Sequence, residues 1–140
     1  MAVSRAVEES NRALLRARDA MDRGYAEPLD IPTLARIAHV SEAHFIRTFR
    51  ATFGETPHRY LQRRRVERAM FLLLQTGQSV TEVCFAVGFS SLGTFSRTFR
   101  EIVGETPSQY RQRRAGAAAR AAGIAPNCFG MAWTRPSSFG

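Results

Sequence analysis

The chain has 140 residues, of which 44% are hydrophobic and 23% are charged, a composition typical of a globular protein with one or two small domains. It carries a net charge of +8, and all 20 of its basic residues are arginine. Its apolar runs are shorter than the roughly 20 residues of a membrane helix. Its N-terminal residues mix arginine and glutamate and lack the apolar stretch of a signal peptide. We therefore expect a cytoplasmic protein without membrane contact.

The excess positive charge lies in the middle of the chain. Residues 1–28 contain five arginines and five acidic residues, whereas residues 29–114 contain 13 arginines and seven acidic residues. A basic folded region suits a polyanion such as nucleic acid, and suits an anionic membrane less well. A GC-rich genome would also favour arginine over lysine, so the location of the charge is more informative than its amount.

The first predicted element is an amphipathic helix over residues 3–23. Its apolar residues recur at mostly helical spacing and predict one buried face, formed by Val3, Val7, Leu14, Ala17 and Met21. We expect this helix to pack on the unit that follows it. Docking on a partner protein is the alternative interpretation.

The centre of the chain contains a duplicated segment. Residues 45–60 are identical to residues 95–110 at ten of sixteen positions, and Gly54-Glu55-Thr56-Pro57 recurs unchanged at residues 104–107. Upstream the offset falls from 50 to 49, so the second copy has one extra residue close to Ser91. This repeat predicts a duplicated supersecondary unit.

In the first copy, start and stop residues outline two short helices joined by a tight turn. Asp30 is placed to cap a helix over about 31–38, and Ser41 to cap a longer helix over about 42–53, which Gly54 ends. This arrangement is typical of a helix-turn-helix unit.

The second copy has the same outline. Ser79 with Glu82 predicts a capping box at the start of a helix over about 80–86, and Ser90 or Ser91 caps the longer helix after it. In both longer helices apolar residues recur at i, i+4 and i+8 and predict the core, namely Phe45, Phe49 and Phe53, then Phe95, Phe99 and Val103. An arginine face opposite such a stripe is often only solvated, but the recurrence of Arg-Thr-Phe-Arg in both units favours ligand contact.

Between the units, Thr56 and Pro57 predict the start of a connecting helix that ends near Gln75. Its length of about 28 Å is of the same order as the roughly 34 Å between successive exposures of one major-groove face. We expect residues 70–74 to be buried on two sides, with a small apolar patch as the alternative. The helix also carries Arg63, Arg64, Arg65 and Arg68. Such a charge run is usually solvated, and its exposed members are alternatively placed to contact phosphate or pair with Glu67, so none of them is assigned singly.

The predicted fold is all-α, with two helix-turn-helix subdomains joined by a long connecting helix and about seven helices in total. Its expected parts are an N-terminal helix (1–28), a first unit (29–56), a connecting helix (57–77), a second unit (78–114) and a tail (115–140). The alanine-rich start of the tail either extends a helix or forms a linker. For the end of the tail, with Trp133, docking and a loose segment stay equally open.

No sequence pattern predicts catalysis, a metal or a cofactor. Cys84 lies in an apolar run, where a small buried thiol is expected, and Cys128 is not at a metal-ligand spacing from it. The histidines lack the surrounding ligands of a zinc site, and neither a phosphate loop nor a nucleophile motif is visible. We therefore expect that the protein is not an enzyme.

The motifs of the second unit resemble the AraC/XylS family of bacterial transcription regulators. The resemblance spans about residues 10–113 and is most specific over 79–91, 95–100 and 104–111. It implies recognition helices near 42–53 and 92–103, each entering a major-groove segment of double-stranded DNA. Cys84 stands where the family usually has alanine.

Carried over by position, the resemblance implies the residues that contact DNA. The implied base-reading residues are Glu42, Ala43, Ile46 and Arg47 in the first helix and Leu92, Gly93, Ser96 and Arg97 in the second. The implied phosphate contacts are Ser41, His44, Arg50, Ser91, Thr94 and Arg100. Because four of the base-reading positions are Ala, Ile, Leu and Gly, contacts with thymine methyl groups and DNA shape are expected to carry more of the specificity, with Arg47 and Arg97 as guanine readers.

The resemblance and the charge together predict a transcription regulator that binds double-stranded DNA as a monomer, contacts RNA polymerase and associates with the nucleoid. The chain is too short for the separate sensor domain of many family members, so it resembles their short members or a fragment. One alternative is an interaction protein that docks on RNA polymerase or another regulator without reading DNA. Another is a DNA-repair enzyme, which would need a reactive cysteine.

Overall fold

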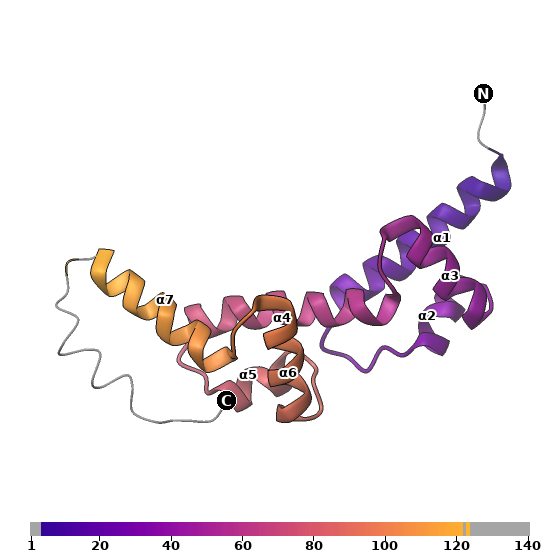
Figure 1. The fold of residues 1–140 in the computed structure, drawn as a ribbon. Helices are drawn as coiled ribbons and strands as arrows, with labels where there is room; N and C mark the ends of the chain where they lie inside the picture. The colour runs from indigo at the N-terminus through magenta and orange to yellow at the C-terminus, as the bar shows by residue number, and fades with distance from the viewer. Residues whose placement is uncertain (1–3, 122, 124–140) are drawn as a thin grey trace. The chain divides into compact units, whose positions relative to one another are not determined.

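The computed structural model describes residues 4–121 and 123, which form helices joined by short turns (Figure 1). In chain order the helices are α1 (Arg5–Arg23), α2 (Ile31–Ile37), α3 (Glu42–Phe53), α4 (Pro57–Gln75), α5 (Val80–Ala86), α6 (Leu92–Val103) and α7 (Pro107–Ala121). The described residues contain seven helices and no strand, which confirms the predicted all-α class. The end of the tail, with Trp133, and Val3 at the other end of the chain lie outside the described residues.

The chain divides into two units within α4. Unit 1 ends at Arg64 and contains α1, α2, α3 and the start of α4. Unit 2 begins at Arg65 and contains the rest of α4 with α5, α6 and α7. The helix-turn-helix of unit 1 is therefore α2–α3, and that of unit 2 is α5–α6.

The predicted caps start and end the helices of unit 1. The Asp30 carboxylate accepts a hydrogen bond of 2.9 Å from the Thr33 backbone N–H, and the Ser41 hydroxyl oxygen accepts one of 3.2 Å from that of His44. Gly54 ends α3 with φ of 81°, in the left-handed region that glycine adopts without a steric penalty. Local sequence chemistry thus sets the length of both helices.

An aromatic cluster fixes α3 in the core of unit 1. Phe45 and Phe49 are fully buried, and the Phe49 ring centroid lies 5.6 Å from that of Phe45 and 5.6 Å from that of Tyr60 on α4. The Tyr60 hydroxyl donates a hydrogen bond of 2.8 Å to Asp22 on α1. Burial, together with this bond, raises the pKa of Tyr60 to about 12, so the phenol stays protonated and keeps its donor at neutral pH.

Unit 2 repeats this cluster. The Phe99 ring centroid lies 5.8 Å from that of Phe95 and 5.7 Å from that of Tyr110 on α7, and both phenylalanines are fully buried. The predicted capping box is confirmed, because the Ser79 hydroxyl and the Glu82 carboxylate each accept the other residue's backbone N–H. Ser91, rather than Ser90, is the cap of α6.

The repeat extends beyond the segment that the sequence identity covers. Leu14, Ala17 and Met21 of α1 are buried in unit 1, and on α4 Val66, Ala69 and Leu73 are buried at the same i, i+3, i+7 spacing. The second half of α4 therefore supplies unit 2 with the kind of buried helix face that α1 supplies to unit 1. A weak signal exists in the sequence, since Arg12-x-x-x-Arg16-Ala17 recurs as Arg64-x-x-x-Arg68-Ala69.

Arg111 of α7 closes the end of α4. Its guanidinium donates hydrogen bonds of 2.9 Å to the Leu73 carbonyl and 2.6 Å to the Gln78 carbonyl. Carbonyls at the end of a helix lack partners within the helix, so a side chain from α7 here serves as a cap. The equivalent position of unit 1 is Leu61, which is buried in the core instead.

Some expectations about burial are wrong. Val7, expected on the buried face of α1, is 48% exposed, because the core of unit 1 begins only at Ala13. In the run 70–74 only Leu73 is buried, while Phe71 and Leu74 are 50% and 42% exposed, so burial on two sides is not found. Phe53 and Val103, at the ends of their helices, are half-buried rather than fully buried.

The structure also decides one alternative that the sequence left open. The alanine-rich start of the tail continues α7 to Ala121 and is thus helical rather than a linker. Within the described part of the chain, no helix is both long enough and apolar enough to cross a membrane.

The turns between the paired helices each contain one residue with positive φ. His39 has φ of 58°, the single non-glycine residue with positive φ among those described, and the equivalent residue of unit 2 is Gly88 with φ of 102°. This backbone conformation costs an L-residue about 1–2 kcal/mol, whereas glycine adopts it freely but loses more entropy on folding.

We expect that His39→Gly raises the free energy of unfolding by about 0.5–1 kcal/mol, because the relief of strain exceeds the added entropy cost. The matched change Gly88→Ala should lower it, since a Cβ is introduced at the same conformation. Thermal and denaturant unfolding, followed by helical circular dichroism, measures both. A lower stability for His39→Gly would contradict this account of the turn.

Candidate nucleic-acid interface

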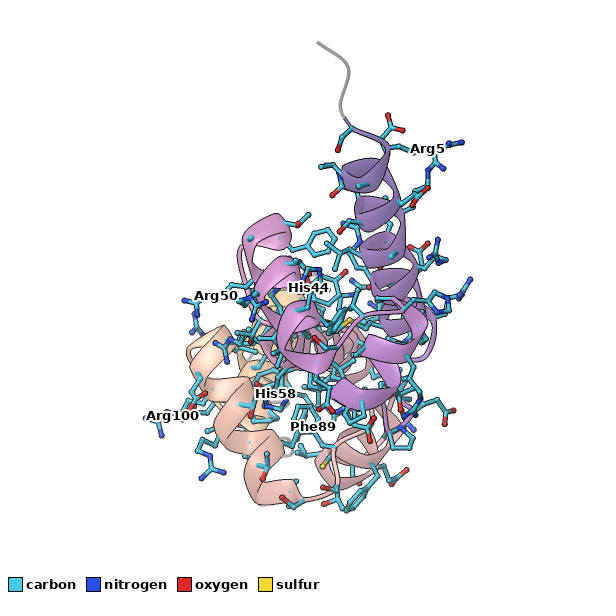
Figure 2. The ribbon with its side chains drawn as sticks, turned by 90° about the vertical axis from the view of Figure 1, so that its right-hand side faces the viewer. Arg5, His44, Arg50, His58, Phe89 and Arg100 are labelled. Atoms are coloured by element: carbon cyan, nitrogen blue, oxygen red, sulfur yellow. The ribbon has the colours of Figure 1, made fainter. Side chains whose placement is uncertain are left out.

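The core contacts of α3 decide which of its residues face outward. Phe45 and Phe49 hold one face of α3 against the core of unit 1, so Arg47, two residues after Phe45, lies on the opposite face. The four implied base-reading residues of this helix are all exposed, namely Glu42, Ala43, Ile46 and Arg47. Arg50, one turn further on, is exposed as well and extends outward from the helix (Figure 2).

The implied residues of α6 are less accessible. Gly93 and Arg97 are exposed, whereas Leu92 and Ser96 are half-buried. A Cβ added at Gly93 would have no heavy atom within 4 Å, so this position leaves open space at the surface of the helix. Arg100 extends outward from α6 as Arg50 does from α3 (Figure 2).

The hydroxyl groups among the implied phosphate contacts already make bonds within the protein. The Ser41 hydroxyl oxygen caps α3, and the Ser91 hydroxyl oxygen accepts the Thr94 backbone N–H at 3.2 Å. The Ser91 hydroxyl also donates to the Thr94 side chain at 2.8 Å. His44 is half-buried in the first turn of α3. Of this group Arg50 and Arg100 have the most freely accessible donors.

The four arginines on the outward faces differ from most arginines of the connecting helix. Within the part of the chain that the structure describes, no hydrogen bond or ion pair engages the guanidinium groups of Arg47, Arg50, Arg97 and Arg100. An arginine cannot lose its charge at neutral pH and presents five N–H donors. Each outward face thus offers two permanent positive charges with all of their donors available to a ligand.

Four arginines of α4 make contacts that the sequence did not predict. Arg63 forms an ion pair of 2.7 Å with Glu55, and Arg64 one of 3.1 Å with Asp22. The Arg65 guanidinium lies over the Phe89 ring at 6.0 Å, and that of Arg68 over the Phe71 ring at 4.7 Å. The partners of Arg64 and Arg65 are far away in the sequence, which is why local sequence reasoning did not find them.

One of these ion pairs is itself part of the repeat. Glu55 and Arg63 in unit 1 correspond to Glu105 and Arg113 in unit 2, where the two charged groups lie 2.8 Å apart. The glutamate belongs to the Gly-Glu-Thr-Pro run that recurs unchanged. This run therefore does more than end the recognition helix, since its glutamate ties the following helix to it.

A further cluster of polar residues lies beside α3. Arg12 and Arg16 of α1 line a groove with His39 and His44, next to the first turn of the recognition helix. Sequence reasoning treated α1 only as a packing helix and did not single out these arginines. Their i, i+4 spacing on an otherwise exposed helix face is the signal that could have found them.

Cys84 does not have the surroundings of a reactive thiol. It is fully buried in unit 2, and its thiol lies 3.5 Å from the Ser91 carbonyl oxygen as a hydrogen-bond donor. Burial raises the pKa of this thiol, which disfavours the nucleophilic thiolate. Among the described residues, no group of three or more His, Cys, Asp or Glu side chains could hold a metal ion.

Comparison with known proteins places this arrangement in a family. A family model described as a helix-turn-helix domain matches residues 34–113. An uncharacterised helix-turn-helix-type transcriptional regulator of Haemophilus influenzae is 43% identical over 61 residues, which are 44% of this chain and 20% of that protein. The bifunctional transcriptional activator and DNA repair enzyme AdaA of Bacillus subtilis is 34% identical over 71 residues, 51% of this chain and 34% of that protein.

The chain thus spans between a fifth and about a third of the length of these two curated relatives. In contrast, it covers nearly the whole of two solved structures. The DNA-binding domain of AdpA, solved in complex with a target DNA, has a TM-score of 0.69 at 34% identity and covers 79% of this chain and 95% of its own. A regulator from Chromobacterium violaceum, described by its AraC-type DNA-binding domain, has a TM-score of 0.68 at 34% identity, with coverages of 77% and 96%. The duplicated helix-turn-helix fold and these matches show that the chain belongs to the AraC family of helix-turn-helix proteins.

Proposed function

We propose that this protein is a sequence-specific regulator of transcription that binds double-stranded DNA through α3 and α6. One observation carries the proposal: both recognition helices present a pair of arginines, at matching positions, whose donors no group of the described chain engages. A duplicated surface of this kind suits a ligand with regularly repeated negative charge. The net charge of +8 agrees with such a ligand.

Within this proposal, α3 and α6 read bases in successive major-groove segments. Arg47 and Arg97 are the guanine readers, and Arg50 and Arg100 contact phosphate. The exposed Ile46 suits contact with a thymine methyl group, and the open space at Gly93 lets backbone or sugar approach α6 closely. We assign Glu42, Ala43, Leu92 and Ser96 to the same base-reading surfaces, and Ser41, His44, Ser91 and Thr94 to backbone contact.

The way in which the protein works follows from the duplication. Because one chain carries two recognition helices, it binds an asymmetric site as a monomer, on the nucleoid in the cytoplasm. RNA polymerase is the partner through which a bound regulator would act on transcription. The buried thiol of Cys84 argues against a cysteine-dependent repair reaction in this part of the chain, so we propose binding rather than catalysis.

Binding should weaken steeply as salt rises, because arginine–phosphate contacts release condensed counterions. For about six phosphate contacts, the slope of log affinity against log salt should be about −5. Fluorescence anisotropy on a site selected from a random DNA pool, repeated over a range of salt concentrations, measures it. Retained affinity with a slope near zero would exclude DNA as the ligand.

The arginines proposed to read bases can be separated from those that contact phosphate. Arg47→Ala and Arg97→Ala should each cost about 1–3 kcal/mol on the selected site and less on random DNA. Arg47→Lys keeps the charge but loses the bidentate geometry, so it should lose specific binding while binding random DNA almost normally. Arg23→Ala, on an exposed part of α1, is the matched control. Equal losses on both kinds of DNA would reassign the residue to a phosphate contact.

If both units contact one DNA molecule, the helical register of α4 must matter. One alanine inserted between Arg64 and Arg65 falls at the boundary of the units and leaves the contacts within each of them in place. It turns the following part of the helix by about 100° and advances it by about 1.5 Å. The variant should keep its helical circular dichroism yet bind the selected site only as well as one unit does. Full affinity would show that the units bind independently or that only one of them binds.

A further inference from the structure

A groove in unit 1 lies between α1 and the turn that leads into α3. It has a volume of about 540 Å³ and is open to solvent. Its charged and imidazole side chains are Glu9, Arg12 and Arg16 of α1, His39 of the turn and His44 of α3. The groove thus begins beside the first turn of the recognition helix and continues along α1.

Two features of this groove favour a negatively charged ligand. Arg12 and Arg16 are exposed one helical turn apart, and no group of the described chain pairs with either guanidinium. Like charges at this spacing weaken an isolated helix, and a bound anion would relieve their repulsion. His39 adds an imidazole donor from a backbone conformation that is unfavourable for any residue except glycine.

The corresponding positions of the second repeat do not carry this chemistry. Arg64 and Arg68 correspond to Arg12 and Arg16, but Arg64 forms an ion pair with Asp22 and Arg68 lies over the Phe71 ring. Gly88 stands in place of His39. The cluster is therefore particular to unit 1 and does not follow from the fold that both units share.

We propose that this groove binds the DNA backbone beside the base pairs contacted by α3, so that α1 extends the phosphate-binding surface of unit 1. This inference rests on the proposed function, because the groove would meet DNA only when α3 does. An enclosed small-molecule site is a poorer fit, because ligand pockets bury most of their ligand and this groove is open to solvent. The ligand chemistry is that of a phosphodiester held by guanidinium and imidazole donors.

Glu9 is the acidic residue in the lining of the groove. Its negative charge weakens the attraction of the groove for phosphate without abolishing it. Its carboxylate lies 3.9 Å from the Arg5 guanidinium, at the end of α1 remote from the core (Figure 2). The pair is exposed on both sides, so it neutralises Glu9 only weakly. Replacing Glu9 with glutamine should therefore strengthen DNA binding, the opposite sign from the arginine variants.

The test compares the full chain with the double variant Arg12→Gln/Arg16→Gln, using Arg23→Gln of the same helix as the control. Glutamine forms helices about as well as arginine, and circular dichroism verifies the fold of each variant. The double variant should lower the magnitude of the salt slope by about 2, one for each phosphate that it no longer neutralises, and weaken binding on specific and random DNA alike. Arg23→Gln should leave both the slope and the affinity at their wild-type values.

Probe length and backbone charge locate the contact. The weaker binding should appear only on probes extended by about half a helical turn at one end of the selected site, because the groove belongs to one unit. A single neutral methylphosphonate, moved along that extension, should reduce wild-type binding at one or two positions and leave the double variant unaffected there. Such non-additivity assigns the phosphate to these arginines.

The outcomes are distinguishable. Wild-type slopes and affinities in the double variant, while Arg47→Ala still loses specific binding, would overturn the groove assignment and leave the proposed function in place. Absence of DNA binding by the wild type would overturn both. Inorganic phosphate is the probe for a free anion: if it binds the free protein at submillimolar concentration, and the double variant loses that binding but not DNA affinity, the groove is an anion site unrelated to DNA.

Discussion

The structure depends on the burial of one aromatic cluster in each unit. Two phenylalanines of the recognition helix are fully buried, and a tyrosine from the next helix packs edge-on against the second of them. Each buried phenylalanine stabilises the fold by about 1.5–3 kcal/mol, so the two of them fix the rotation of the helix about its own axis. Arg47 and Arg97, two residues after the first phenylalanine, therefore lie on the outward face.

The two aromatic clusters also show how the units share a helix, because α4 contributes buried residues to both cores. The first part of α4 carries Tyr60, which completes the aromatic cluster of unit 1, and the rest carries Val66, Ala69 and Leu73, which are buried in unit 2. Since residues of both cores lie on one continuous helix, α4 is more than a spacer. α7 repeats the first of these roles with Tyr110, and Arg111 then caps the end of α4.

The two units share their core and their arginine pairs but differ at their edges. In unit 1 the residues that would surround DNA are mostly polar, exposed and unengaged, and they include His39 and the arginines of α1. In the second repeat Gly88 replaces His39, the arginines that correspond to Arg12 and Arg16 contact other side chains, and two of the implied base-reading residues are half-buried. A duplicated scaffold with unequal surfaces suits the reading of a site with two unlike halves.

The sequence by itself determined the helices, their caps and the family, because these depend on interactions within a few residues or on an unbroken motif. Ser41 and Ser79 cap the helices for which the sequence predicted them as caps. The buried phenylalanines of the recognition helices are those that recur every four residues in the sequence. Only the tertiary structure decided what becomes of the charged side chains. Arg64 and Arg16 look alike in sequence, yet Arg64 is held by Asp22 from another helix, while Arg16 lies free in a groove. The exposure of Val7 and Phe71 was likewise decided by the tertiary structure. It depends on how far each core extends along its helix, and the spacing of apolar residues does not give that length.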